Sequence, residues 1–254
     1  MEDKSSLKFS VITVCKNSSR TIEKCIQSVN KQNYQNIEHI IIDGVSTDDT
    51  LQIINEVKNS STFVHVGADD GIYDAMNKGI AIASGDYIGI LNSDDYYPRE
   101  TIISEINSFC LTNNSQIISG NLSIVDNSEN ILRHIKSSRF KKWMLHYGWM
   151  LPHPATFISR SLFERIGDYN TNFVTAADYE FFIRALIKHK VNFVTIDSIF
   201  VNMLVGGATT SGLKSYWKTT KEIQIALKLH GIRARLLLLL FRLPMKFFSQ
   251  RLRR

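Results

Sequence analysis

The stretch 86–95, DYIGILNSDD, predicts a buried strand that runs directly into acidic residues. Its first six residues are apolar and β-rich for most of their length, which is typical of a short strand inside a sheet. Its last four are Asn92-Ser93-Asp94-Asp95. Ligands of open parallel sheets bind beyond the carboxyl ends of the strands. We therefore expect a ligand site where this strand ends, provided that similar strands lie beside it.

Similar strands do occur, and they alternate with segments whose apolar residues repeat at helical spacing. A helix is expected after Ser46, which can cap it, with Asp48 and Asp49 in its first turn. Strands are expected at 9–14, 37–42, 62–66 and 86–91, and further helices at 21–32 and 72–83. Strand–helix repeats of this length predict an α/β fold with a mostly parallel, doubly wound (Rossmann-like) sheet flanked by helices.

The second half of the chain is less regular and has no internal repeat and no Pro-, Gly- or Ser-rich linker. Helices are expected at 100–111, 161–166, 179–188 and 213–230, and strands at 115–125, 131–135 and 191–200. The simplest division is one α/β body, residues 1–230, followed by a tail, residues 231–254.

Composition and charge exclude several classes of protein. The 254 residues are 44% hydrophobic and 21% charged, which excludes a disordered or fibrous chain. Three cysteines without a CxxC pair argue against a disulfide scaffold or a zinc ribbon and favour a reducing cytoplasm. No signal peptide and no run of about 18 apolar residues is visible, so we expect a cytoplasmic location without a transmembrane helix.

The net charge of +6 is concentrated in the tail. Seven of the 30 Lys and Arg residues and none of the 24 acids lie in 231–254, so the body has 23 cations against 24 acids. We therefore expect no nucleic-acid partner. Four tail cations share one helical face, with Leu and Phe around them: Arg235, Arg242, Lys246 and Arg253. Such a helix can lie on an anionic membrane, and the alternative is a helix docked on the body.

The acids and amides at the strand ends are the candidate ligand-binding residues. No GxGxxG follows the first strand, so the usual nicotinamide or flavin fingerprint is absent. If Ser46 caps its helix, Asp43 is free to accept a hydrogen bond from a ribose or a base. Asp70 either caps the helix that follows it or contacts a base. Asn77 and Lys78 lie either on a solvated helix face or against a phosphate or sugar.

The Asn-Ser-Asp-Asp stretch has two interpretations. Two adjacent carboxylates repel each other, and a bound Mg²⁺ or Mn²⁺ that also contacts substrate phosphates would offset their charge. The alternative is a plain turn, because Asp-Asp before Tyr-Tyr-Pro is favourable turn chemistry.

Three features of the second half add candidates. Asp178 either caps a helix or acts as a general base that is ionised at neutral pH. His153 lies between two prolines in an extended segment, where it either orients a substrate or packs within a loop. The loop 206–212, with Thr209 and Ser211, either folds over a diphosphate or simply connects two elements.

Taken in order, these segments resemble the family-2 glycosyltransferases, which have the GT-A fold. The motifs are Val11-Ile12-Thr13-Val14 with Asn17, the stretch from Ile41 to Thr50, Asp70 to Gly79, Asn92 to Asp95, and Ala177-Asp178-Tyr179-Glu180. The stretches 71–79 and 152–157 resemble in particular the bacterial enzymes that build capsule, O-antigen or exopolysaccharide units. The resemblance implies a nucleotide-binding half, residues 1–98, and an acceptor and catalytic half, residues 99–230.

The resemblance also implies roles for single residues. Asp178 would be the catalytic base, and Asp95, with Asp94, would bind Mn²⁺ or Mg²⁺ at the position of the family's DxD motif, whose first acid is Asn92 here. Nucleotide and donor contacts would come from Thr13, Val14, Asn17, Asp43, Asp70, Asn77, Lys78, Asn92, Ser93 and Asp94. Acceptor or phosphate contacts would come from His153, Glu180, Thr209 and Ser211.

The sequence therefore predicts an inverting, metal-dependent glycosyltransferase at the inner face of the cell membrane. It would move a sugar from a nucleotide sugar, with UDP favoured, to a hydroxyl of a lipid-linked glycan. One alternative is a sugar nucleotidyltransferase, disfavoured because no Gly-rich basic loop follows the first strand. The other is a membrane-bound module that binds nucleotide sugars without turnover.

Overall fold

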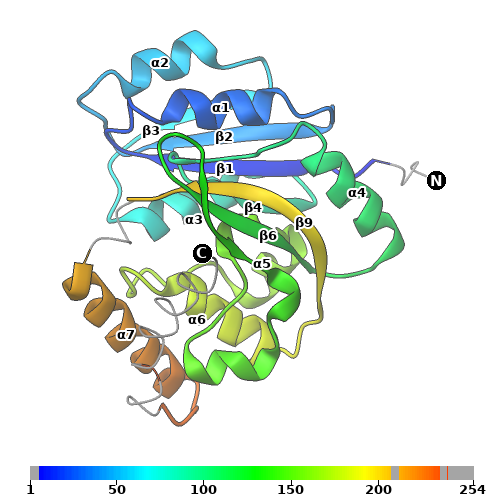
Figure 1. The fold of residues 1–254 in the computed structure, drawn as a ribbon, viewed down its shortest axis with the longest axis vertical. Coiled ribbons are helices and arrows are strands. Elements are labelled where there is room, and N and C mark those ends of the chain that lie inside the picture. Colours follow the sequence, from blue (N-terminus) through cyan, green and yellow to red (C-terminus); the bar gives the residue numbers. More distant parts are fainter. Residues whose placement is uncertain (1–5, 207–211, 235–238, 240–254) are drawn as a thin grey trace.

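The computed structural model describes residues 6–206, 212–234 and 239 (Figure 1). The strands are β1 (Phe9–Cys15), β2 (Ile37–Asp43), β3 (Thr62–Val66), β4 (Tyr87–Ile90), β5 (Asp95–Tyr96), β6 (Ile117–Val125), β7 (Ile131–Ile135), β8 (Thr156–Ser159) and β9 (Phe193–Leu204). The α-helices are α1 (Ile22–Asn30), α2 (Thr50–Val57), α3 (Ile72–Ile82), α4 (Ile102–Thr112), α5 (Arg160–Ile166), α6 (Ala177–Ile183) and α7 (Gly212–Leu229). Short 3₁₀ helices are η1 (Ser137–Arg139), η2 (Lys142–Tyr147) and η3 (His153–Ala155), and a π-helical turn, η4 (Arg184–Lys188), continues α6.

One sheet connects both halves of the chain, in the order β3-β2-β1-β4-β8-β6-β9-β5, with β7 paired to β6. Strands β1 to β4 are all parallel, as the βαβ pattern predicts, and the short β5 pairs antiparallel with β9. β8 joins β4 to β6 in antiparallel orientation, and β6 and β9 are parallel. The predicted α/β fold with a mostly parallel sheet flanked by helices is therefore confirmed. The boundary between the two halves at residue 98 stays a prediction.

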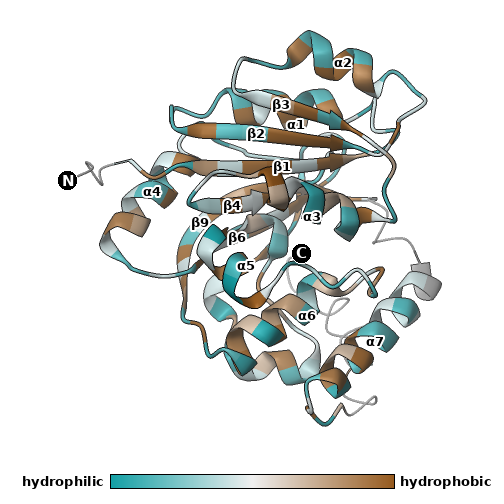
Figure 2. Cartoon of the chain, turned by 180° about the vertical axis from the view of Figure 1, so that it is seen from behind, coloured by the Kyte–Doolittle hydropathy of each residue, from teal (hydrophilic) through white to brown (hydrophobic). Residues whose placement is uncertain are grey.

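Alternation along β1 divides the apolar core between the two faces of the sheet. Phe9 and Val11 pack with α1 and α4, while Ile12 and Val14 pack with α3 and α6. Figures 1 and 2 show α1 and α2 on one side of the sheet and α3, α5 and α6 on the other, and the strands between them are largely hydrophobic. This packing fixes the strands, and so fixes where their carboxyl ends lie.

Two predictions at the level of single elements need correction. The sequence pattern does not reveal β5 and β8, because strands of two and four residues are too short to show a period. Ser46 does not cap the second helix, because α2 begins only at Thr50 and its N-cap residue is Asp49.

The close approach of β6 and β9 depends on Gly120, and this can be tested. A Cβ at Gly120 would lie 2.2 Å from the ring of Phe200. We expect Gly120→Ala to lower the free energy of unfolding by about 2–3 kcal/mol, measured by urea denaturation. Phe200→Leu should recover part of this loss in the double variant, because it removes the clashing ring atoms. A Gly120→Ala protein as stable as wild type would contradict this packing.

Candidate active site

The loops that follow β1, β2 and β4 meet at one edge of the sheet. Cys15 and Asp43 are register partners at the ends of β1 and β2, and β4 runs parallel beside β1. The hydroxyls of Ser18 and Ser93 are 2.9 Å apart, which joins the loop after β1 to the Asn92–Asp95 loop. The loops that carry Asn17, Asp43 and Ser93 therefore lie side by side at this carboxyl edge.

Asp43 is fully buried and closes the loop after β2 instead of standing free. Its Oδ1 accepts the Ser46 N–H at 2.8 Å, and its Oδ2 accepts the Ser46 hydroxyl at 2.6 Å. The expectation that Ser46 leaves Asp43 free is therefore wrong, since Ser46 is the hydrogen-bond partner of Asp43. Asp43 therefore fixes the conformation of the loop after β2 at this edge of the sheet.

Thr13 and Val14 are core residues rather than surface residues of a nucleotide pocket. The Thr13 hydroxyl lies 2.9 Å from His39 Nε2 on the α1 side of the sheet, and both residues are buried. Val14 packs into the core on the other face. The structure thus does not support side-chain contacts from either residue, because the pleat of β1 turns both into the interior.

Asn17 links two loops of the carboxyl edge. Its Oδ1 accepts the Thr47 N–H at 2.8 Å, and its own N–H donates to the Ser46 hydroxyl at 2.8 Å. Asn17 has φ of 51°, a left-handed conformation that Asn tolerates better than most residues. It therefore holds the loops after β1 and β2 together, and its side chain is exposed beside them.

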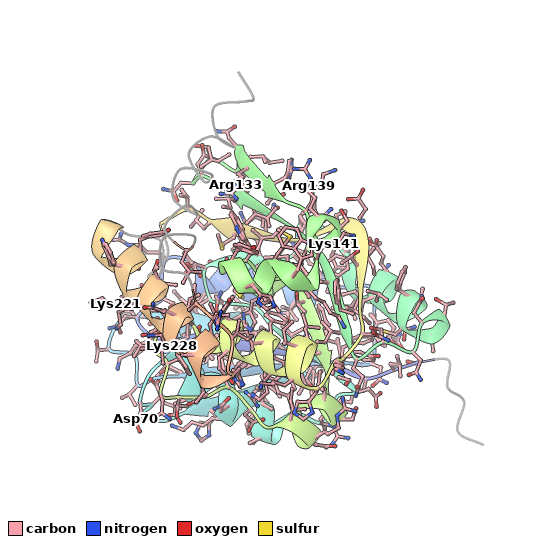
Figure 3. All side chains as sticks on the ribbon, turned by 90° about the horizontal axis from the view of Figure 1, so that it is seen from below. Asp70, Arg133, Arg139, Lys141, Lys221 and Lys228 are labelled. Atoms are coloured by element: carbon pink, nitrogen blue, oxygen red, sulfur yellow. The ribbon has the colours of Figure 1, made fainter. Side chains whose placement is uncertain are left out.

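Of the two acids after β3, Asp69 and not Asp70 faces the end of β2. A Cβ at Gly44 would lie 2.4 Å from Asp69 Oδ2, so this carboxylate sits directly against the end of β2. Asp70 is exposed at the periphery (Figure 3), and its N–H donates to Asp74. The structure favours Asp69 over Asp70 as a ligand-facing acid, and sequence alone could not tell which of two neighbours turns inward.

Asn77 and Lys78 on α3 hold neighbouring backbone segments through hydrogen bonds. Asn77 uses both amide atoms on the backbone of Tyr169, at 2.8 and 3.0 Å. Lys78 donates to the Ala68 carbonyl and pairs with Asp74, each at 2.7 Å. The phosphate or sugar contact expected for Asn77 is not supported, because both of its polar atoms are engaged elsewhere. Lys78 instead holds the loop that carries Asp69.

The Asn92–Asp95 loop contains buried side-chain oxygens that have no hydrogen-bond donor. Asp95 is 1% exposed, and its Oδ2 accepts from Asn92 Nδ2 at 2.9 Å. Asp95 Oδ1 and Asn92 Oδ1 are both buried and have no hydrogen-bond partner. Burial raises the pKa of Asp95 well above its usual range, and repulsion from Asp94 adds to this shift. Burial also raises the pKa of Asp94.

These residues fit a divalent cation. Carboxylate and amide oxygens are the ligands that Mg²⁺ and Mn²⁺ prefer, and two such oxygens here are buried without a partner. Nowhere in the described ranges do three His, Cys, Asp or Glu side chains gather as a metal site on their own. The remaining ligands would then be water and substrate phosphates, as is common for Mg²⁺. The turn interpretation does not account for the unpartnered oxygens.

Asp178 lies in the first turn of α6 and is held by α3. Its Oδ1 accepts the Tyr73 hydroxyl at 3.0 Å and the Tyr179 N–H at 2.8 Å. The N-cap residue of α6 is Ala176, so helix capping does not explain Asp178. Tyr73 stands at the start of α3, which follows the carboxyl end of β3. Asp178 is therefore brought to the same edge of the sheet as the loop of Asp69, and it is only partly buried.

His153 lies in a buried polar group behind Asp178. Its Nε2 is 2.8 Å from the Tyr169 hydroxyl, and the Tyr169 ring also packs against Tyr73. Burial lowers the pKa of His153, and the charge of Asp178 opposes that shift. His153 is therefore a neutral, packed residue at neutral pH, and it begins the 3₁₀ helix η3 instead of lying in the expected extended segment. It supports Tyr73 and Asp178 from behind and has little surface of its own.

Glu180 is a structural ion-pair residue, which corrects its place among the acceptor contacts. It is 2% exposed, and its carboxylate pairs with Arg184 at 3.1 Å and with His230 Nε2 at 2.6 Å. These bonds tie α6 to the segment after α7. Thr209 and Ser211, the other two candidates of this group, lie outside the described residues.

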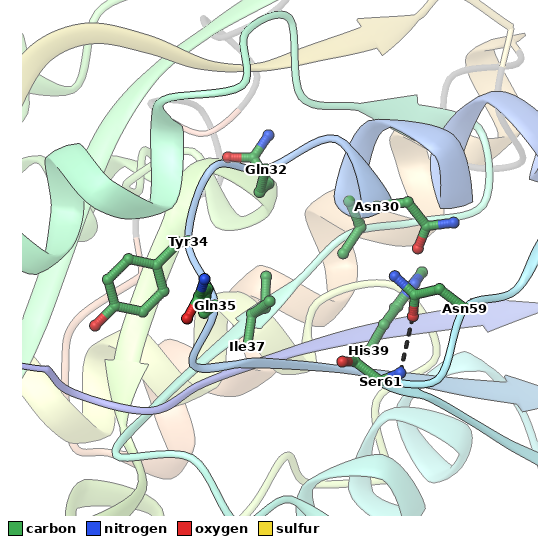
Figure 4. Close-up of a pocket in the computed structure, with 9 residues that line it drawn as sticks. Asn30, Gln32, Tyr34, Gln35, Ile37, His39, Asn59 and Ser61 are labelled. Atoms are coloured by element: carbon green, nitrogen blue, oxygen red, sulfur yellow. Dashed lines mark hydrogen bonds between the residues drawn. The ribbon is translucent and has the colours of Figure 1, made fainter.

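A separate pocket of about 240 Å³ opens at the opposite, amino-terminal edge of β2 (Figure 4). It is lined by Val29, Asn30, Gln32, Tyr34, Gln35, Ile37, His39, Asn59 and Ser61, none of which is acidic. Burial lowers the pKa of His39 to about 3, so the histidine is neutral. This pocket does not offer the charge that a metal and a diphosphate require, and it does not overlap the acid-bearing edge.

An α/β sheet with acids at its carboxyl edge is the arrangement that the resemblance to the family-2 glycosyltransferases implies. Comparison with known proteins agrees. Residues 10–171 match the family model for glycosyl transferase family 2, and the chain belongs to this family. It is therefore a glycosyltransferase of the hexosyltransferase type.

Curated relatives that are 32% identical to the chain, over 181 and 182 matched residues, include two bacterial proteins. One is an uncharacterized glycosyltransferase of Mycobacterium tuberculosis, matched over 70% of this chain and 68% of the relative. The other is the UDP-Glc:alpha-D-GlcNAc-diphosphoundecaprenol beta-1,3-glucosyltransferase WfaP of Escherichia coli, matched over 70% of each chain.

Two solved structures share the fold. S. aureus TarS in complex with UDP-GlcNAc matches 87% of this chain with a TM-score of 0.69 and 20% identity. The match spans 66% of the TarS chain, slightly under two thirds. A mannosyltransferase from Pyrobaculum calidifontis in complex with GDP-Man and Mn²⁺ matches 96% of this chain and 81% of its own, with a TM-score of 0.62 and 14% identity.

The buried charge of Asp95 leads to a prediction about stability. The folded pKa of Asp95 lies above the usual 3.8, so its ionisation opposes folding, and the penalty grows as pH rises through the folded pKa. We expect Asp95→Asn to raise the free energy of unfolding of the metal-free protein at neutral pH by about 1–2 kcal/mol. Mn²⁺ should raise the melting temperature of the wild type, more so at higher pH because protons compete with the cation, and should not change that of the variant.

Asp126→Asn is the matched control for this experiment. Asp126 is an acid of the turn between β6 and β7 that accepts hydrogen bonds from Asn130, and it should not affect the response to Mn²⁺. A less stable Asp95→Asn protein, or one that still responds to Mn²⁺, would contradict the proposed site.

Proposed function

We propose that the chain transfers a sugar from a UDP-sugar to a hydroxyl of a lipid-linked glycan, with inversion and with a divalent cation. One observation supports this proposal most: Asp178, which is not a helix cap, is held by Tyr73 at the start of α3, and both α3 and the buried Asn92–Asp95 loop follow carboxyl ends of parallel strands. The named activity of the E. coli relative supports a UDP-sugar and a lipid-linked acceptor. The Mn²⁺ in the complex of the P. calidifontis mannosyltransferase supports the cation.

The donor would bind along the carboxyl edge of β1, β2 and β4. Asp69 is placed to accept a hydrogen bond from the base or ribose, and the loops held by Asn17 and Asp43 form the floor. Asp95, Asp94 and Asn92 would hold the cation and, through it, the diphosphate. When bound, the cation supplies positive charge that stabilises the negative charge growing on the departing diphosphate.

The acceptor hydroxyl would approach from the side of Asp178. The Asp178 carboxylate accepts the hydroxyl proton, and the oxygen attacks the anomeric carbon opposite the diphosphate. The bond from the anomeric carbon to the phosphate oxygen breaks, and UDP leaves with that electron pair. A single displacement inverts the anomeric centre. Tyr73 keeps the carboxylate oriented by donating to Oδ1, and it is therefore a positioning residue.

The membrane placement expected for the tail is also part of the proposal. The structure describes residues 231–234 and 239 of that segment, so most of the predicted amphipathic helix lies outside the described residues. Leu239 is buried in the core, and its carbonyl accepts the Tyr216 hydroxyl of α7 at 3.0 Å. At this residue the tail is docked on the body, as the alternative interpretation requires. No helix of the described part of the chain has the length and hydropathy to span a bilayer.

The role of Asp178 is tested by release of UDP and by the configuration of the product. We expect Asp178→Asn to lower kcat by about 10³-fold, within the range for loss of a general base, with unchanged donor affinity. Tyr73→Phe should lower kcat by about tenfold, because the carboxylate loses one orienting hydrogen bond. Retained anomeric configuration, pyrophosphate release from a nucleoside triphosphate, or an active Asp178→Asn protein would each reject the proposal.

The choice between the two acids after β3 is tested by donor binding. Calorimetry with a UDP-sugar and Mn²⁺ should show affinity about tenfold lower or more for Asp69→Asn, since a hydrogen bond to a charged group is lost. Asp70→Asn, the neighbouring control, should bind within about twofold of wild type, because its carboxylate faces solvent. If Asp70→Asn instead bound the donor more weakly than Asp69→Asn, Asp70 and not Asp69 would be the donor contact.

A further inference from the structure

Residues 131–147, which form β7, η1 and η2, make a surface that we call the basic face. It has five cations: Arg133, Lys136, Arg139, Lys141 and Lys142. Lys136, Arg139 and Lys141 are exposed, and the other two are half-buried. The sequence has no acid from Asn130 to Phe163. Figure 3 shows Arg133, Arg139 and Lys141 on the same side of the molecule.

Like other cations of the body, such as Lys218 and Lys221, these five have no acidic partner among the described residues, and the sequence places no acid between Asn130 and Phe163 to supply one. None of them forms an ion pair with a carboxylate in the ranges that the structure describes, whereas several others do: Lys8, Lys24, Lys78, Arg99, Arg160 and Arg184. Lys142 donates to the Val191 carbonyl instead. The positive charge of the basic face is therefore uncompensated, which favours an anionic partner.

The basic face also exposes large apolar side chains. Trp143 is 62% exposed, and its ring makes an edge-to-face contact with the exposed ring of Tyr147 at 5.8 Å. Ile131 and Leu132 are about half exposed at the start of β7. Trp and Tyr beside Lys and Arg are typical of surfaces that lie at the boundary between lipid and water. The two aliphatic residues favour a lipid over a nucleic acid, because they gain only from an apolar phase.

The basic face is joined directly to the residue next to Asp178. The Tyr179 hydroxyl donates a hydrogen bond to the carbonyl of Leu145, which lies within η2 between Trp143 and Tyr147. Leu145 itself is fully buried against the core that includes α6. A surface bound by η2 would therefore lie close to the acceptor side of the proposed site.

We infer that the basic face docks the protein on an anionic phospholipid bilayer, so that Asp178 meets an acceptor held in the same bilayer. The purpose of this docking rests on the proposed function, but the docking itself does not need turnover. Lys and Arg side chains supply attraction to the anionic headgroups, and the exposed rings of Trp143 and Tyr147 enter the interfacial layer.

Sedimentation of the full chain with lipid vesicles tests this inference. We expect binding to vesicles of phosphatidylcholine mixed with phosphatidylglycerol and little binding to phosphatidylcholine alone. The double variant Lys141→Ser/Trp143→Ser should bind the anionic vesicles about tenfold more weakly, since each cation contributes roughly fivefold. The matched control, Trp217→Ser/Lys221→Ser, removes an exposed Trp and Lys from α7 and should bind like wild type.

Three results would overturn the inference. The first is unchanged binding by the basic-face variant, which would leave the tail as the membrane contact. The second is an equal loss of vesicle binding in the α7 control. The third is full competition of a single-stranded oligonucleotide with the vesicles. Hydrolysis of UDP-glucose in the absence of vesicles reports on the donor site separately. It should be equal in wild type and in the basic-face variant. If neither protein hydrolyses the donor, the proposed function is in question while the vesicle result stands.

Discussion

The uncompensated carboxylate of Asp95 is the constraint around which the candidate site is organised. It is buried beside Asp94, one of its oxygens has no hydrogen-bond partner, and a buried charge without a partner is costly to folding. The fold holds this carboxylate in place from two sides, through Asn92 and through the pairing of β5 with β9. This arrangement is consistent with a site in which a bound cation and a diphosphate partner the ionised Asp95 carboxylate. It explains why the Asn92–Asp95 loop is more than a turn.

The sequence was sufficient to predict the βαβ half, because each strand is a short run rich in β-branched and other apolar residues and each helix has one apolar face. It was also sufficient to predict that acids gather at one sheet edge, since parallel strands share a carboxyl end. It could not predict orientation at single positions. Thr13 faces the core, and Asp69 rather than Asp70 lies against the end of β2. Glu180 is paired with Arg184 and His230. These outcomes depend on contacts between residues far apart in the chain, which no local pattern encodes.

The second half of the chain supplies the proposed base and the basic face. Asp178 reaches the edge of the sheet only because α6 packs under α3, where Tyr73 donates to it. The same helix carries Tyr179, whose hydroxyl fixes η2 and with it the exposed Trp143. The proposed base, Asp178, is thus the neighbour on α6 of the residue that holds the candidate membrane contact on η2. This geometry gives a physical reason for a transferase of lipid-linked acceptors to keep an exposed aromatic and basic surface.

A crystal structure with UDP-glucose and Mn²⁺, with the metal located by its anomalous scattering, tests the central claim most directly. We predict one strong manganese peak at coordination distance from Asp95 and from the diphosphate, with the uracil on the side of Asp69 and the anomeric carbon facing Asp178. A donor bound at the amino-terminal edge of β2, or a metal held away from the Asn92–Asp95 loop, would contradict it.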